Sequence, residues 1–73
     1  MAFYTNNTRY RAIVTLQISG LISPDKAISI GPPATPRHAG AALGIADWEV
    51  PAGECLILHE GTEAALLAVR NAP

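Results

Sequence analysis

The segment from Tyr10 to Ser19 constrains the fold of this chain more than any other stretch. Its side chains alternate between an apolar series and a mainly polar series, in which only Ile13 is apolar. The apolar series consists of Tyr10, Ala12, Val14, Leu16 and Ile18. Alternation with a period of two predicts a β-strand that buries one face against a core and leaves the other face in water. We therefore expect a β-sheet to organise the chain.

Further short strands are expected downstream. Lys26 to Ile30 follows a turn at Ser23 to Lys26, in which proline suits the second position of a type I turn. The runs Ala41 to Ala46 and Cys55 to Leu58 are predicted to fold back on each other across Val50 to Gly53. Because residues 55–58 are apolar on both sides, this segment is expected to be a central strand.

The segment from Thr62 to Arg70 is compatible with two structures. Thr62 suits a helix N-cap, Glu63 and Arg70 suit the two ends of a helix dipole, and alanine and leucine are strong helix formers. The same residues also alternate as they would in a strand. Propensity slightly favours the helix, and a β context would override it.

The domain organisation is expected to be simple. Residues 1–9 are predicted to form a flexible arm or an edge extension, and residues 10–73 a single small β domain. Residues 31–40 contain Pro32, Pro33 and Pro36, so they are predicted to form an exposed loop rather than a regular element. The expected fold is mainly β, of a β-clip, β-roll or sandwich-like type, with a short C-terminal helix as the open alternative.

Size and charge indicate a covered surface. The chain has 73 residues and a single cysteine, so an internal disulfide cannot supplement a small core. Only 15% of its residues are charged, against about 25% in soluble domains. Residues 1–40 carry an excess of basic side chains and residues 41–73 an excess of acidic ones, which could steer head-to-tail association. We expect self-association or docking on a larger protein assembly.

Other partners and locations are not expected. Neither charged half is dense enough to indicate nucleic acid. The longest apolar run falls far short of the roughly 20 residues of a membrane span. The N-terminus lacks the basic start and apolar middle of a signal peptide. The expectation is a protein of the cytoplasm or of a virion, not one secreted by a signal peptide.

No residue group matches a catalytic or metal centre. Cys55 and His59 would lie about 13 Å apart along a strand, too far for proton transfer, so Cys55 is expected to be a small buried hydrophobe. Together with His38 and Glu60 they also lack the close paired spacing of structural zinc sites. We expect no enzyme activity, no cofactor and no metal.

The candidate contact residues fall into two groups. One is Trp48 with its acidic neighbours, which is expected to be a partly buried anchor at a sheet edge, although interface tryptophans also occur in acidic surroundings of this kind. The other lies in the proline-rich loop, where a basic pair could meet an anionic ligand, although an exposed polar pair is the simpler interpretation. The residues are Asp47, Trp48 and Glu49 in the first group and Pro33, Arg37 and His38 in the second.

The stretch Ala41 to Gly61 resembles a recurrent sequence pattern of β-clip-type domains. It combines an apolar strand (Ala41 to Ala46), an aspartate, the segment Val50 to Glu54, and an apolar strand closing at Glu60 and Gly61. In that group it is similar to domains of the antifreeze and sugar-acid dehydratase type and to bacteriophage head decoration proteins. The resemblance implies a small β domain and assigns no functional residue.

These observations favour a non-catalytic structural or assembly protein. It is expected to be a small oligomeric or particle-associated subunit, such as a phage-type capsid decoration protein. The alternatives are a phage-encoded adaptor or inhibitor that docks on a larger host protein through Trp48, and a small-ligand-binding domain.

Overall fold

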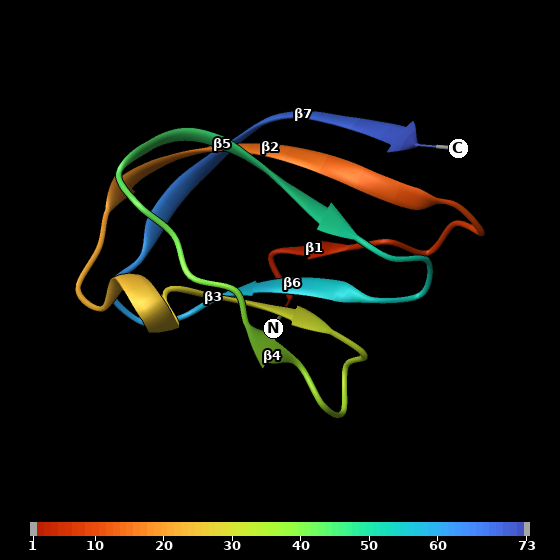
Figure 1. Ribbon diagram of the computed structural model, residues 1–73, viewed down its shortest axis with the longest axis horizontal. Helices are drawn as coiled ribbons and strands as arrows, with labels where there is room; N and C mark the ends of the chain where they lie inside the picture. The colour runs from red at the N-terminus through yellow and green to blue at the C-terminus, as the bar shows by residue number, and fades with distance from the viewer. Residues whose placement is uncertain (1, 73) are drawn as a thin grey trace.

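Strand β2 (Arg11–Gly20) lies at the centre of a three-stranded antiparallel sheet in the computed structural model, which describes residues 2–72. Its neighbours are β5 (Gly44–Val50) on one side and β7 (Glu63–Ala72) on the other. A second antiparallel sheet faces this one, in the order β1-β6-β3-β4 (Figure 1). Its strands are β1 (Tyr4–Thr5), β6 (Cys55–Leu58), β3 (Ile28–Gly31) and β4 (Arg37–His38). The expectation of a small, mainly β domain is confirmed.

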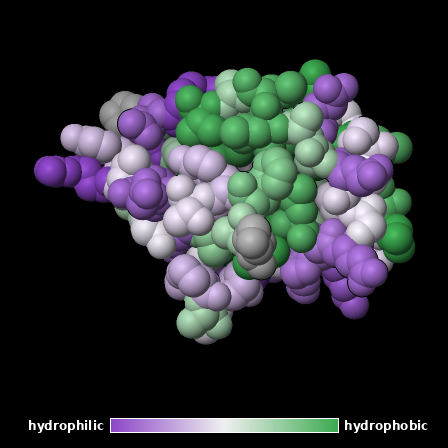
Figure 2. Space-filling model, turned by 180° about the vertical axis from the view of Figure 1, so that it is seen from behind, coloured by the Kyte–Doolittle hydropathy of each residue, from purple (hydrophilic) through white to green (hydrophobic). Residues whose placement is uncertain are grey.

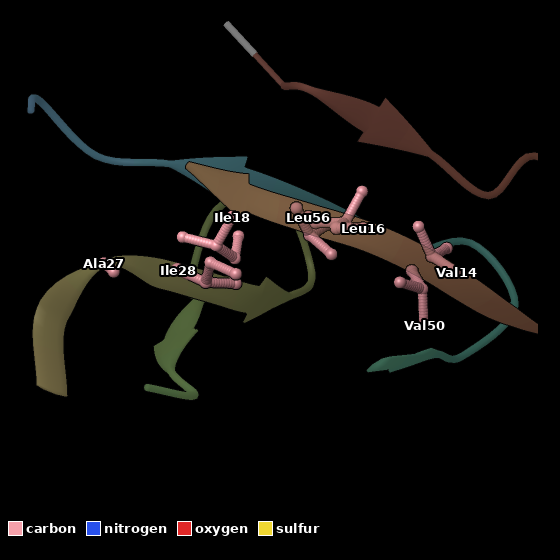
Figure 3. Packing of buried hydrophobic residues seen from close by; sticks show 7 residues of the cluster. All are labelled: Val14, Leu16, Ile18, Ala27, Ile28, Val50 and Leu56. Carbon is pink, nitrogen blue, oxygen red and sulfur yellow. The ribbon is translucent and has the colours of Figure 1, made fainter. Parts of the chain in front are cut away.

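The alternating face of β2 forms the centre of the core. Val14, Leu16 and Ile18 are buried, whereas the residues between them lie on the outer face of the sheet. Tyr10 belongs to the expected apolar series but precedes the strand and is exposed. The opposing sheet contributes Ile28 and Leu56, and the cluster is completed by Ala27 and Val50 (Figure 3).

The strands around the Val50 to Gly53 turn do not form the expected hairpin. β5 pairs with β2 in one sheet, whereas β6 pairs with β1 and β3 in the other. The turn itself forms, with the Glu54 amide donating to the Pro51 carbonyl at 3.1 Å and Gly53 at a φ of 78°. A positive φ at this position is what a type II turn requires. The turn carries the chain from one layer to the other, and β6 is central as predicted.

The C-terminal segment is a strand rather than a helix. β7 pairs with β2 along nearly its whole length, from Ala72 opposite Arg11 to Glu63 opposite Gly20. Pairing satisfies the backbone groups along one side of β2, which a helix at this position would leave exposed. A register shift between the pairs Thr15–Ala68 and Leu16–Leu66 leaves Leu67 as a bulge. Tertiary pairing thus overrides the helical propensity of alanine and leucine.

The proline-rich segment is more regular than the sequence indicates. Gly31 ends β3, and Arg37 and His38 form β4, which pairs with β3 antiparallel. Between β3 and β4 the irregular part is a five-residue turn over residues 32–36, which contains a hydrogen bond of 3.0 Å from the Thr35 amide to the Pro32 carbonyl. Proline is accommodated because it occupies only this turn.

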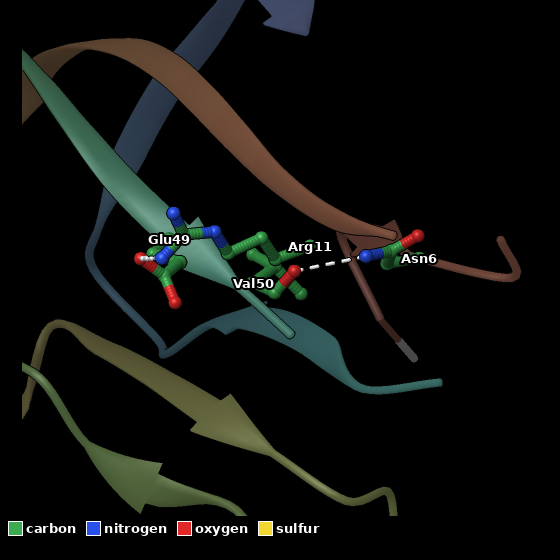
Figure 4. A network of polar contacts seen from close by, with 4 residues as sticks. All are labelled: Asn6, Arg11, Glu49 and Val50. Atoms are coloured by element: carbon green, nitrogen blue, oxygen red, sulfur yellow. Dashed lines mark hydrogen bonds and ion pairs between the residues drawn. The ribbon is translucent and has the colours of Figure 1, made fainter. Parts of the chain in front are cut away.

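Asn6 ties the N-terminal segment to both sheets. Residues 4 and 5 form the edge strand β1 on β6, which corresponds to the edge extension rather than a free arm. The fully buried side-chain amide of Asn6 then donates to the carbonyl oxygen of Tyr10 at 2.7 Å and to that of Val50 at 2.9 Å, and Figure 4 shows the bond to Val50. Its side-chain oxygen accepts from the amide and hydroxyl of Thr8.

No helix within residues 2–72 is long and apolar enough to cross a membrane. The one helical turn among them is the 3-10 helix η1 (Pro24–Lys26), in which the Lys26 amide donates to the Ser23 carbonyl at 3.1 Å. This is the bond that the predicted turn at Ser23 to Lys26 requires.

Replacing Asn6 by alanine should lower the free energy of unfolding by about 1–3 kcal/mol, because the carbonyl of Val50 would be left buried without its donor. The adjacent Asn7 is exposed, so Asn7→Ala is a matched control and should change stability by less than about 0.5 kcal/mol. Urea unfolding followed by circular dichroism measures both. Equal stabilities of the two variants would contradict a structural role for the Asn6 amide.

Candidate functional site

Strand β7 exposes aliphatic side chains on both of its faces. Leu66 and Val69 lie opposite Leu16 and Val14 and so face the core side, yet they remain 47% and 39% exposed. The bulge residue Leu67 is 49% exposed. Hydrophobic side chains gather along this part of the surface in the view from behind (Figure 2). Within residues 2–72, β7 pairs only with β2, so its other edge has no strand beside it.

The outer face of the three-stranded sheet carries two exposed ion pairs. Arg11 approaches Glu49 at 3.3 Å, as Figure 4 shows, and Arg70 approaches Asp47 at 3.6 Å. The Thr15 hydroxyl also donates to the Asp47 carboxylate. The Arg11–Glu49 pair joins the basic half of the chain to the acidic half, whereas Arg70 and Asp47 both belong to the acidic half. Exposed pairs of this kind contribute little to stability.

Trp48 and its acidic neighbours lie on opposite sides of β5. The register places Trp48 opposite Val14 on the core side, where it packs against the core cluster and its indole N–H lies 3.4 Å from the Gly40 carbonyl. Asp47 and Glu49 point to the outer face. A partner could therefore not contact the tryptophan and both acids as one flat patch.

The residues of the proline-rich loop are likewise separated. Pro33 lies in the exposed turn, and Arg37 in β4 is also exposed. His38 instead faces a serine of the neighbouring strand, because the register pairs it with Ser29. His38 is also exposed, with its Nδ1 3.1 Å from the Ser29 hydroxyl, so the basic pair is divided between the two faces of β4.

Ser29, His38 and His59 form a polar cluster that the sequence did not reveal. The Ser29 hydroxyl lies 3.1 Å from Nδ1 of His38 and 2.6 Å from Nε2 of His59. The ring centroids of the two histidines are 5.2 Å apart. A serine hydroxyl has a single proton, so at least one imidazole must donate its N–H to the serine oxygen when both bonds form.

This cluster supports a structural role better than a nucleophilic one. A serine beside an imidazole is the pairing that nucleophilic catalysis uses, but Ser29 is only 2% exposed and lies between the two rings. A reacting carbonyl would have to displace one histidine to reach its oxygen. The two rings therefore cover a polar group in the middle of the four-stranded sheet.

Cys55 is buried, as its residue type predicts. Its Sγ lies 3.7 Å from the Gly31 carbonyl, whereas His59 bonds to Ser29. Residues 2–72 contain no group of three or more His, Cys, Asp or Glu side chains placed to hold a metal ion. No pocket is detected among these residues either.

Two of these features escaped sequence reasoning for the same reason. Ser29, His38 and His59 are far apart in the sequence, and only the register of β3 with β4 and the position of His59 just beyond β6 bring them together. The one sequence feature that pointed to this cluster was the polar residue Ser29 between the apolar residues Ile28 and Ile30. The exposed surface of β7 was hidden by the helix-or-strand ambiguity.

Comparison with protein-family models, with curated proteins and with solved structures finds no match to this chain. The resemblance to β-clip-type domains therefore stays a prediction.

Ser29→Ala should lower the free energy of unfolding by about 1–2 kcal/mol, since the two part-buried hydrogen bonds between the Ser29 hydroxyl and the imidazoles of His38 and His59 would be lost. Ser23 is exposed and its side chain makes no capping hydrogen bond, so Ser23→Ala is the control and should be nearly neutral. Chemical denaturation of both variants provides the measurement. A neutral Ser29→Ala would argue against a structural role for the cluster.

Proposed function

We propose that this protein is a non-catalytic assembly subunit that associates with other copies of itself. The single observation that carries the proposal is the surface of β7, where Leu66, Leu67 and Val69 are exposed beside a strand edge that has no neighbouring strand among residues 2–72. Unpaired edges and contiguous exposed apolar side chains are the features through which β proteins bind further chains.

The size of the core supports the same proposal. A chain of 73 residues with one buried cysteine has a small core and cannot be stabilised by an internal disulfide. Burying a second apolar surface against another copy would supply additional stability. The large exposed hydrophobic residues outside β7 include Phe3, Ile22, Leu43 and Ile45. Association through β7 would therefore cover one continuous strand surface rather than scattered side chains.

A particle-associated subunit, such as a capsid decoration protein, is one setting in which a small self-associating β domain would work. In that setting β7 would serve contacts between copies, and the exposed residues of the opposite sheet edge, such as Arg37, would remain free for the particle. The partners we propose are the same chain and a larger protein assembly.

Light scattering after size exclusion should give a mass that is a multiple of 7.7 kDa and that falls on dilution. Leu67→Lys should raise the dissociation constant at least about tenfold, because each interface would then desolvate a charge. Leu43→Lys is the matched control, since Leu43 is 67% exposed and lies outside β7. A 7.7 kDa species at every concentration would contradict self-association and favour docking on a different, larger protein.

A further inference from the structure

We propose that two copies of the chain join edge to edge through β7, antiparallel, about a twofold axis that passes between Leu66 and Leu67. The result would be a continuous six-stranded sheet in the order β5-β2-β7-β7-β2-β5. This inference rests on the proposed self-association and adds to it a surface, a register and a symmetry.

The sequence of β7 reads almost the same in both directions. Residues 63–70 are Glu-Ala-Ala-Leu-Leu-Ala-Val-Arg, so reversal about the centre matches leucine with leucine and alanine with alanine. It also matches alanine with valine and glutamate with arginine. An isologous twofold interface requires this kind of self-complementarity, because each residue meets its counterpart twice.

The bulge at Leu67 makes this register sterically consistent. Opposite residues in antiparallel strands must lie on the same face of the sheet. In a regular strand, residues 65 and 68 or residues 64 and 69 would lie on opposite faces, because an odd spacing separates them. In β7, Ala65 and Ala68 both share the outer face, opposite Gln17 and Thr15.

The same holds on the core side of the sheet. Ala64 lies opposite Ile18 and Val69 opposite Val14, and both of these β2 residues are buried in the core. The extra residue has shifted the alternation by one, so that the two halves of β7 present matching faces to a second copy. Without the bulge, the near-palindrome could not pair with itself in this register.

Charge complementarity favours the same register. Glu63 precedes Ala64 and so belongs to the outer face, which it shares with Arg70. The proposed pairing places Glu63 opposite Arg70 of the second copy at both ends of the apolar segment. Within one chain, Arg70 reaches Asp47 at 3.6 Å with its side chain 63% exposed. It can therefore contact Asp47 of its own chain and Glu63 of the second copy together, or move from one carboxylate to the other. Opposite charges directly across an antiparallel pair are favourable, and like charges are unfavourable.

The apolar centre of the pairing would cover the surface that β7 leaves exposed. Leu66 and the bulge residue Leu67 of both copies would gather about the axis, and Val69 would meet Ala64 of the second copy. The unpaired backbone groups along the free edge would bond to their counterparts, which removes the open edge altogether. Edge and side chains are thus covered by one contact.

Charge reversal tests the register. Glu63→Arg and Arg70→Glu should each raise the dimer dissociation constant about tenfold or more, because each places like charges opposite one another twice per dimer. The double variant Glu63→Arg, Arg70→Glu should return the constant to within about threefold of the unaltered chain. Asp47→Asn is the control for the contact within one chain and should not weaken the dimer. Analytical ultracentrifugation gives the constants, and circular dichroism verifies folding.

Disulfide trapping tests the same register independently of charge. Variants Ala65→Cys and Ala68→Cys, mixed and oxidised, should yield a covalent heterodimer, since opposite residues of antiparallel strands have a Cα separation that a disulfide can span. Each variant alone should form no such link, because neither position faces itself, and Cys55 is buried.

The outcomes separate this inference from the proposed function. The proposed register is supported if each charge-reversal variant weakens the dimer, the double variant restores its dissociation constant, and the mixed cysteine variants form the covalent heterodimer. A chain that dimerises but shows no restoration by the double variant and no trapping would overturn the register and leave self-association standing. A chain that remains monomeric at every concentration would overturn both.

Discussion

The buried amide of Asn6 is the contact on which the two-layer arrangement depends. Asn6 follows β1 in one sheet, and its side chain donates to Tyr10, just before β2 in the other, and to Val50, at the end of β5. Its backbone carbonyl also accepts from Gly53 at 2.8 Å, and its backbone amide donates to Glu54 at 2.9 Å. At this end of the molecule the chain passes between the sheets twice, from β1 to β2 and from β5 to β6. Hydrogen bonds from Asn6 hold both connections. A buried group of this kind is tolerated because each of its hydrogen-bonding atoms has a partner.

The unequal lengths of the strands explain the exposed surface. In the three-stranded sheet β2 and β7 each have 10 residues, whereas β3 and β6 have four and β1 and β4 two. The shorter sheet covers β2 and leaves much of β7 uncovered. Exposed aliphatic residues there follow from this mismatch, and a second copy with the same mismatch offers a surface of the same shape and composition.

Local sequence patterns predicted where the strands lie better than they predicted which strands pair with each other. The alternation of β2, the central position of β6 and the turns at Ser23 and Pro51 could be read from residue type, because each depends on near neighbours in the chain. The pairing of β5 with β2 and of β6 with β1 and β3 could not. A turn fixes a change of direction, but which sheet each arm joins is decided by contacts far away in sequence.

The sequence by itself determined a small, mainly β domain, a buried face on β2 and a buried Cys55. Only the tertiary structure decided that residues 63–72 form a strand, that Ser29 lies between two histidines, and that Trp48 points away from Asp47 and Glu49. The physical reason is common to all three. The burial of a strand residue and the partners of its side chain depend on register, which is set by pairing between distant segments rather than by the residues themselves.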